Sequence, residues 1–110
     1  EDVKIAPANA MPGVKYFKIR EWVRQCTRFE RFNLMNNRPP VMGMDLVFCR
    51  NVLIYFEDPI KKAVQTMLAR AMSPGGVMVL GASVQMLVPE YFESRLGKGG
   101  PWYVRNDTRV

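Results

Sequence analysis

The segment Met44-Asp-Leu-Val-Phe-Cys-Arg-Asn-Val-Leu-Ile-Tyr-Phe56 decides the expected fold, because a charged and an amide side chain interrupt an apolar run. Residues 46–49 are continuously apolar, which is typical of a strand buried on both faces of a parallel sheet. Arg50 and Asn51 follow the carboxyl end of this strand, where ligands of open α/β sheets bind. We therefore expect a polar binding site there. The alternative is an ion pair of Arg50 with a nearby carboxylate and a turn capped by Asn51.

The residues after this segment predict a strand–helix–strand unit. Asp58 and Pro59 favour a helix start, as N-cap and first helical residue. Ser73-Pro-Gly-Gly76 is expected to end the helix, because proline cannot continue its hydrogen bonds, and residues 77–80 predict a second buried strand. This order indicates a right-handed βαβ crossover and an α/β fold with a doubly wound, mostly parallel sheet. The apolar helix face would contain Ile60, Ala63, Val64, Met67, Leu68, Ala71 and Met72, while Lys61, Lys62, Gln65 and Arg70 would face water.

The flanking segments carry weaker patterns. Residues 1–14 are expected to be a loop or a disordered lead-in. Helical spacing from Phe17 to Cys26 predicts a short helix with Trp22 in the core, and residues 27–32 weakly predict a strand. A short helix is expected around residues 89–92. The glycine-rich residues 97–101 are a weak candidate for a phosphate loop and more simply a turn into a last strand at residues 102–105.

Composition excludes several classes of function. The 110 residues form one domain or a piece of one, 48% are hydrophobic, and no stretch is long and apolar enough to cross a membrane. The absence of histidine excludes Ser-His and Cys-His catalysis and most zinc chemistry. Cys26 and Cys49 lie in apolar contexts without metal-ligand spacing, which favours a reduced, cytoplasmic protein with buried thiols and no metal. The net charge of +6 indicates either an acidic partner or a solvated basic surface, and no aromatic and basic interleaving points to nucleic acid.

The segment Phe48-Cys-Arg-Asn-Val-Leu-Ile-Tyr-Phe56, followed by Asp58-Pro59 and Ser73-Pro-Gly-Gly76, resembles the carboxyl-terminal half of a CheR-type chemotaxis methyltransferase. The Cys-Arg-Asn-Val string is more specific than the Pro-Gly-Gly turn, which many class I methyltransferases share. The resemblance implies a Rossmann-like fold and the cofactor S-adenosyl-L-methionine, with S-adenosyl-L-homocysteine as product. It also implies a cytoplasmic protein-glutamate O-methyltransferase that modifies glutamates in the cytoplasmic domain of chemoreceptors.

The resemblance also implies residue roles. Asn33 and Leu34 would lie against the adenosyl half of the cofactor, and Arg50 and Asn51 would lie close to the cofactor. Tyr55 would face the reacting methyl group and the substrate, so Arg50 and Tyr55 are the candidate catalytic residues. Without the resemblance, Asn33 is a turn residue, and Tyr55 is a core aromatic whose hydroxyl bonds a backbone carbonyl.

Methyl transfer to a carboxylate suits a chain without histidine. A glutamate with an ordinary pKa of about 4.3 is already ionised near neutral pH, so no general base is needed. The protein must instead position the carboxylate, which can contribute roughly 7–11 kcal/mol. Arg50 is the natural group to orient a carboxylate, although a tight bidentate pair would stabilise the ground state as well as the transition state.

The resemblance extends from about Phe17 to Arg105 and covers the second half of the catalytic domain. We therefore expect residues 15–110 to lack the helical amino-terminal domain, the glycine-bearing cofactor loop and the acidic residue that binds the ribose. Relatives typically have Gly-His-Ser-Glu where this chain has Gly81-Ala-Ser-Val84. Ala82 and Val84 thus replace a histidine and a glutamate.

These departures leave alternatives open. We expect the fragment to be inactive alone, with exposed sheet edges that favour a homodimer or a domain swap. One alternative is a catalytically inactive interaction module of a chemotaxis or signalling protein. Another is a class I methyltransferase acting on nucleic acid, which the positive charge permits but no residue specifies.

Overall fold

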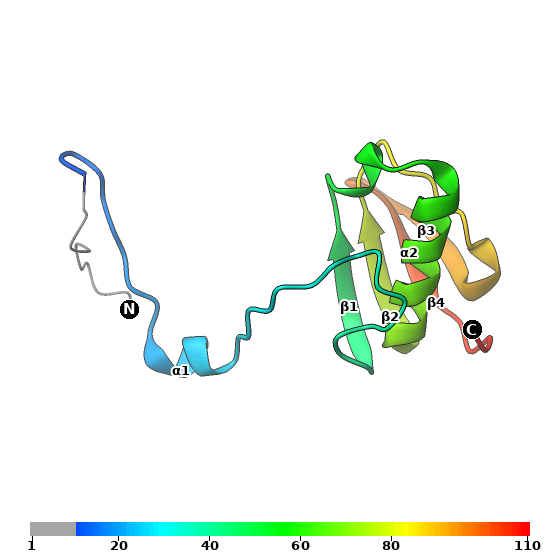
Figure 1. The fold of residues 1–110 in the computed structure, drawn as a ribbon, viewed down its shortest axis with the longest axis horizontal. Helices are drawn as coiled ribbons and strands as arrows, with labels where there is room; N and C mark the ends of the chain where they lie inside the picture. Colours follow the sequence, from blue (N-terminus) through cyan, green and yellow to red (C-terminus); the bar gives the residue numbers. More distant parts are fainter. Residues whose placement is uncertain (1–10) are drawn as a thin grey trace. The chain divides into compact units, whose positions relative to one another are not determined.

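The structure is a computed structural model that describes residues 11–110, which divide into two compact units between Arg31 and Phe32 (Figure 1). The first unit contains the short helix α1 (Glu21–Gln25), and the second unit, Phe32–Val110, contains the sheet. Of the expected loop at residues 1–14, residues 1–10 lie outside the described residues. Residues 11–14 form a turn in which Val14 N donates to Met11 O at 3.3 Å.

The first unit is less regular than predicted. α1 spans five residues, none of them buried, and the side chain of Trp22 is 65% exposed, so the prediction that Trp22 lies in a core is wrong. A helix this short gains little stability without tertiary packing. Residues 27–32 form no strand, so the weak strand prediction is wrong. Their three charged side chains break the alternation, and Arg28 pairs locally with Glu30 instead.

The sheet of the second unit has four strands in the order β1-β2-β4-β3: β1 (Met44–Cys49), β2 (Met72–Leu80), β3 (Phe92–Gly97) and β4 (Gly100–Arg105). β1 and β2 are parallel, with Cys49 beside Leu80, whereas β4 is antiparallel to both β2 and β3. The α/β class is therefore confirmed, with a mixed sheet. Among the described residues one of the three pairings is parallel, so the doubly wound, mostly parallel arrangement stays a prediction.

The helix α2 (Asp58–Ala71) connects β1 to β2 through the 3-10 turn η1 (Leu53–Tyr55), which confirms the strand–helix–strand unit. Pro59 lies in the first turn of α2, as predicted. The N-cap residue is Glu57 and not the predicted Asp58, and its side chain does not cap the helix. β2 begins directly after α2 and includes residues 73–76. The predicted Ser-Pro-Gly-Gly turn is thus part of the strand, where Gly75 has a φ of +83°.

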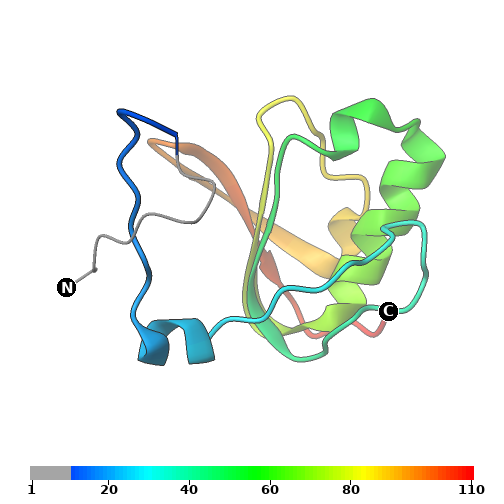
Figure 2. The same ribbon diagram turned by 60° about the vertical axis from the view of Figure 1, so that its left-hand side comes forward.

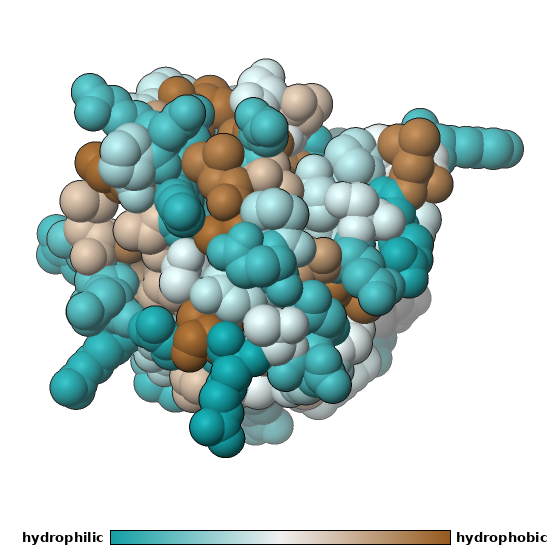
Figure 3. All heavy atoms as spheres, turned by 90° about the vertical axis from the view of Figure 1, so that its right-hand side faces the viewer, coloured by the Kyte–Doolittle hydropathy of each residue, from teal (hydrophilic) through white to brown (hydrophobic). Residues whose placement is uncertain are grey.

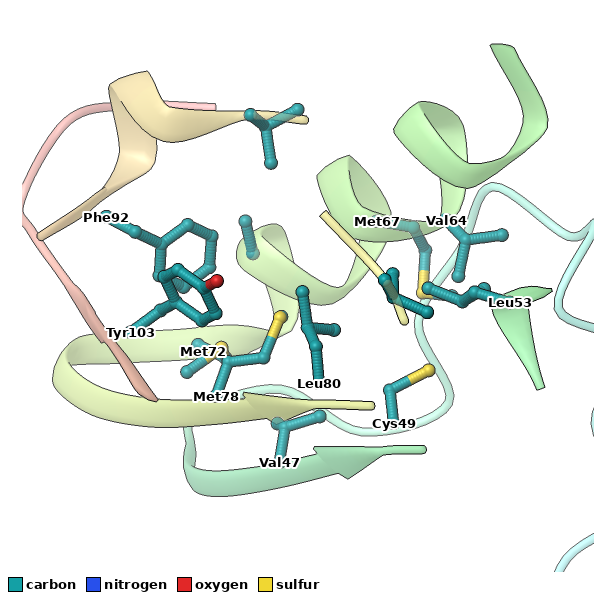
Figure 4. Close-up of a cluster of buried hydrophobic side chains, with 13 residues drawn as sticks. Val47, Cys49, Leu53, Val64, Met67, Met72, Met78, Leu80, Phe92 and Tyr103 are labelled. Atoms are coloured by element: carbon teal, nitrogen blue, oxygen red, sulfur yellow. The ribbon is translucent and has the colours of Figure 1, made fainter. Parts of the chain in front are cut away.

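α2 packs on one face of the sheet, and the core lies between them (Figures 2 and 4). Val47 and Cys49 of β1 point into this core. Their neighbours Leu46 and Phe48 remain 51% and 65% exposed on the other face, so β1 is not buried on both faces as expected. The physical reason is that, within the unit Phe32–Val110, α2 covers one face of the sheet and no helix covers the face with Leu46 and Phe48. The core members are Val47, Cys49, Leu53, Val64, Met67, Ala69, Met72, Met78, Leu80, Val84, Val88, Phe92 and Tyr103.

Two buried polar residues were not predicted. Gln65 was expected to face water but is fully buried, because residues 85–87 fold back over α2. Its Nε2 donates to Gln85 O at 3.0 Å, and its Oε1 accepts from Leu87 N at 2.8 Å. Conversely, Ala63 was placed on the apolar face and is exposed.

Arg105, at the end of β4, is also buried, with 7% of its surface exposed. It donates from Nε to Ala69 O at 2.9 Å and from Nη1 to Asn106 O at 2.7 Å and Thr108 O at 2.9 Å. Its guanidinium carbon lies 5.5 Å from the centre of the Tyr91 ring. A buried cation is expected to be fully hydrogen-bonded. Arg105 therefore ties α2 to the carboxyl-terminal segment.

Residues 89–92 were expected to form a short helix. The 3-10 turn η2 (Pro89–Tyr91) confirms its start, but β3 follows at once from Phe92. Charged and polar side chains cover most of the face seen in Figure 3, with hydrophobic residues in small groups. Within residues 11–110, no helix has the length and apolar character needed to span a membrane.

Candidate functional site

Arg50 and Asn51 lie at the carboxyl end of β1, as the sequence predicts. The parallel strand β2 ends beside them, because Cys49 pairs with Leu80. A Cβ built on Gly81 would lie 3.5 Å from Asn51 N and 3.9 Å from Asn51 Oδ1, so the two loops are in van der Waals range. Both side chains are exposed. The cationic side chain of Arg50 and the amide of Asn51 therefore lie next to each other at the carboxyl ends of β1 and β2, where both are accessible to a polar ligand.

Asn51 has a φ of +62°, and it is the one non-glycine residue with positive φ within residues 11–110. Asparagine tolerates this left-handed conformation better than most residues. The turn that it makes lets the chain leave β1 sharply, which keeps Arg50 at the strand end. Asn51 thus lies at the bend after β1, its side chain caps no turn within residues 11–110, and its amide is exposed.

The alternative for Arg50 was an ion pair with a neighbouring carboxylate. Within residues 11–110, the ion pairs are made by Arg24, Arg28, Lys61 and Arg95. Arg50 makes no ion pair with any carboxylate in that part of the chain. Its guanidinium is therefore free to meet an anion from another molecule.

Tyr55 is positioned by its neighbour Leu53. The side chain of Leu53 is fully buried in the core (Figure 4), which anchors η1. Tyr55, two residues later, is 80% exposed. The alternative that Tyr55 is a core aromatic is therefore wrong, and its phenol is accessible to a molecule in solution.

Asn33 and Leu34 lie elsewhere, beside the first half of α2. Asn33 Oδ1 accepts from Met35 N at 2.9 Å and Asn33 O accepts from Asn36 N at 2.9 Å, so Asn33 closes a turn. Leu34 is half-buried and lines a cavity of about 180 Å³. The cavity is otherwise lined by Met35, Asn36, Asn37, Pro59, Ile60, Ala63 and Val64. Arg50 does not line this cavity.

A second hollow, of about 70 Å³, brings Arg50 together with residues that sequence reasoning missed. They are Val79, Leu80, Gly81, Ala82, Gly99, Gly100, Pro101 and Tyr103. The turn between β3 and β4 reaches this edge because β4 lies antiparallel to β2. The Gly-Gly-Pro pattern was visible in the sequence, but its place beside Arg50 depends on strand order, which no local pattern predicts.

Cys49, the last residue of β1, is buried as expected, whereas Cys26 is exposed, so the prediction of two buried thiols is wrong for Cys26. Burial raises the pKa of the Cys49 thiol above the ordinary value of 9.0, which keeps it protonated and a poor nucleophile near neutral pH. No three metal-ligating side chains gather within residues 11–110.

A parallel crossover with polar residues at the carboxyl ends of its strands is the arrangement of ligand-binding α/β proteins. Residues 9–98 match the family described as CheR methyltransferase, SAM binding domain. The chain therefore belongs to this family, which confirms the resemblance seen in residues 48–76.

Several curated proteins are similar to the chain. The chemotaxis protein methyltransferase of Vibrio anguillarum is 41% identical over 66 residues, covering 60% of this chain and 24% of that protein. The chemotaxis protein methyltransferase Cher2 of Pseudomonas putida is 34% identical over 82 residues, covering 74% of this chain and 30% of the relative. The probable biofilm formation methyltransferase WspC of Pseudomonas aeruginosa is 33% identical over 85 residues, covering 74% and 20%. The chain thus spans less than a third of the length of each.

The cofactor of this family is S-adenosylmethionine, and the residues of the chain fit part of it. The cavity beside Leu34 is mainly apolar, as an adenine ring requires, and Arg50 and Asn51 offer donors and an amide oxygen to polar groups. However, the two cavities of about 180 and 70 Å³ are each smaller than the roughly 300–1,000 Å³ of typical small-molecule sites. Neither cavity alone is large enough to hold the whole cofactor.

Proposed function

We propose that residues 15–110 are the carboxyl-terminal half of the S-adenosylmethionine-binding domain of a protein-glutamate O-methyltransferase that modifies chemoreceptor cytoplasmic domains. The observation that carries this proposal is the meeting of Arg50, Asn51 and Gly81 at one sheet edge, in a chain of the CheR family. The names of the Vibrio and Pseudomonas relatives support the chemotaxis setting. Their greater length supports the view that the whole site needs residues outside this chain.

Each site residue has a role in this proposal. Asn33 and Leu34 hold the adenosyl half of the cofactor, Asn51 binds its polar groups, and Arg50 lies close to the cofactor. When bound, S-adenosylmethionine supplies a methyl group on a sulfonium. Arg50 orients the substrate carboxylate, and the exposed Tyr55 faces the reacting methyl group and the substrate.

The chemistry asks this chain for positioning rather than for proton transfer. The glutamate nucleophile is ionised at neutral pH, because its ordinary pKa is about 4.3. An exposed guanidinium holds a carboxylate loosely, since water competes for the same donors. A loose contact orients the carboxylate without stabilising the ground state as much as the transition state, so the carboxylate stays reactive.

The proposal extends to the fold and the cellular location. We infer that further strands continue the sheet beyond β1, which is an edge strand, and that further helices cover the face with Leu46 and Phe48. The exposure of these two apolar side chains supports a doubly wound sheet in the longer protein. The two free cysteines support a reducing, cytoplasmic location.

A second candidate function is that of an inactive interaction module. The segment Gly81–Val84 favours it, because Val84 is buried in the core and Ala82 carries no functional group, at the positions where the resemblance to CheR-type enzymes implies a glutamate and a histidine. The free edge of β1 and the exposed Phe48 would then serve self-association, as a homodimer or a domain swap. Sedimentation equilibrium tests this: the wild-type chain would dimerise, and Phe48→Glu would make it monomeric.

The enzyme proposal is tested by replacing the matching segment of the Vibrio anguillarum relative with this chain. We expect the chimera to bind S-adenosylhomocysteine and to methylate a purified chemoreceptor cytoplasmic domain. Asn51→Ala should weaken binding, and Tyr55→Phe should slow transfer. The interaction module would be established instead by a folded chimera that does not bind S-adenosylhomocysteine and does not methylate the receptor domain. This chimera would still bind the receptor domain when it carries Arg50→Ala and Tyr55→Phe.

A further inference from the structure

The turn between β3 and β4 lies beside Arg50. Gly97 pairs with Gly100, so the hairpin closes through the two residues Lys98 and Gly99. β4 runs antiparallel to β2, with Tyr103 opposite Met78, and therefore its first residues lie near the carboxyl end of β2. Gly99, Gly100 and Pro101 line the same hollow as Arg50.

The structure requires glycine at two positions of this turn, for different physical reasons, and not at the third. Gly97 is required by packing, because an added Cβ would lie 2.5 Å from the Trp102 ring. Gly100 is required by its backbone, since its φ is +112°. Gly99 is exposed and has neither constraint, because an added Cβ there would meet nothing within 4 Å. The fold therefore has room for a side chain at Gly99, which is one of the residues that line the hollow.

The hollow has the size and charge to receive a carboxylate. Its volume of about 70 Å³ accommodates a small polar group, given that one water occupies roughly 30 Å³ in the liquid, but not a nucleoside. Arg50, which makes no ion pair with any carboxylate of residues 11–110, supplies a fork of donors that matches the two carboxylate oxygens. A glycine in the wall lets a ligand approach the backbone closely.

We propose that the hollow between Arg50 and the Gly99–Pro101 turn receives the carboxylate of the substrate glutamate, and that Gly99 is a specificity-determining position. This inference rests on the proposed function, and it adds the β3–β4 turn to the site. Gly99 admits the substrate side chain, and any side chain at position 99 narrows the path to Arg50.

A carboxylate could also come from the amino-acid end of the cofactor. Two observations favour the substrate. Gly99 and Pro101 are exposed, so the hollow is reached from solvent, as a protein side chain requires. The cavity beside Leu34, which we assign to the adenosyl half of the cofactor, shares no lining residue with the hollow.

The first test is an NMR titration of the ¹⁵N-labelled chain with glutarate, with uncharged glutaramide as the control ligand. We expect glutarate to shift the amide signals of Gly81, Gly99 and Gly100 and glutaramide to leave them unchanged. Gly99→Val and Arg50→Met should each raise the dissociation constant by about tenfold or more, which corresponds to 1.4 kcal/mol. Lys98→Met, in the same turn but outside the hollow, should leave it nearly unchanged. Equal shifts with glutaramide, or shifts spread over the surface lysines, would overturn the proposal.

The second test separates substrate from cofactor in the Vibrio anguillarum chimera. Gly99→Val should raise the KM for the receptor domain about tenfold and leave the dissociation constant of S-adenosylhomocysteine unchanged. A rise in that dissociation constant would assign the hollow to the cofactor and refute the inference. Binding of glutarate at this hollow in a chimera that does not bind S-adenosylhomocysteine would instead count against the proposed function alone.

Discussion

Gln65 is the buried residue that most directly links α2 to the loop that carries Gly81 and Ala82. Its two side-chain hydrogen bonds, to Gln85 O at 3.0 Å and from Leu87 N at 2.8 Å, hold residues 85–87 against the helix. Gln65→Leu keeps a side chain of similar size and removes both bonds. We therefore expect a loss of stability and a loosened loop beside Arg50.

The size of the loss follows from the groups left behind. A buried donor or acceptor without a partner costs about 1–3 kcal/mol. Gln85 is exposed and Leu87 is half-buried, so water partly compensates, and the sum should lie near the lower part of the range for two groups, about 2–4 kcal/mol.

Urea unfolding monitored by far-ultraviolet circular dichroism measures this difference. Gln85→Leu is the matched control, because the exposed Gln85 side chain is removed and its backbone carbonyl remains. It should change the free energy of unfolding by less than about 0.5 kcal/mol. If Gln65→Leu is no more destabilising than Gln85→Leu, the two hydrogen bonds do not hold the loop.

Gln65→Glu adds a pH test. The substituted carboxylate would be buried and would face Gln85 O, so desolvation would raise its pKa in the folded state. The folded protein would then bind more protons than the unfolded one, and its stability should rise as the pH falls toward the range in which this carboxyl is protonated. A variant whose stability is independent of pH in this range, relative to wild type, would show that position 65 is solvated.

Three further predictions concern single residues. Tyr55→Phe should leave the stability unchanged, since Tyr55 is 80% exposed, and should lower methyl transfer by the chimera by roughly 10- to 100-fold if its hydroxyl positions the substrate. A thiol reagent should label Cys26 in the native chain and Cys49 only on unfolding. Because burial raises the pKa of the Cys49 thiol above 9.0, the stabilising contribution of this thiol should fall as the pH rises past about 9.0. The variant Cys49→Ala should not show this loss of stability. Arg105→Met should cost about 2–4 kcal/mol in urea unfolding, because the four hydrogen bonds that Arg105 donates are lost, whereas Arg95→Met, which breaks an exposed ion pair, should cost less than about 1 kcal/mol.

Local signals in the sequence were sufficient for the central unit. The Asp58-Pro59 start and the helical spacing after it predicted α2, and the short apolar runs on either side predicted β1 and β2. The same signals placed Arg50 and Asn51 at the end of β1. These features depend on neighbours within a few residues, and they could therefore be predicted from the local sequence pattern.

The features that sequence reasoning missed depend on contacts between distant segments. Gln65 occupies an outward position by helical spacing and is buried only because residues 85–87 cover it. Trp22 has helical spacing but belongs to a helix with no buried residue. The position of Gly99 beside Arg50 follows from the strand order, in which β4 pairs with β2.

The most direct test of the account is calorimetric titration of S-adenosylhomocysteine into this chain and, in parallel, into the Vibrio anguillarum chimera. We expect weak or no binding by the chain, binding by the chimera, and weaker binding by the chimera with Asn51→Ala. A folded chimera that does not bind S-adenosylhomocysteine would contradict the assignment of Arg50 and Asn51 to the cofactor site.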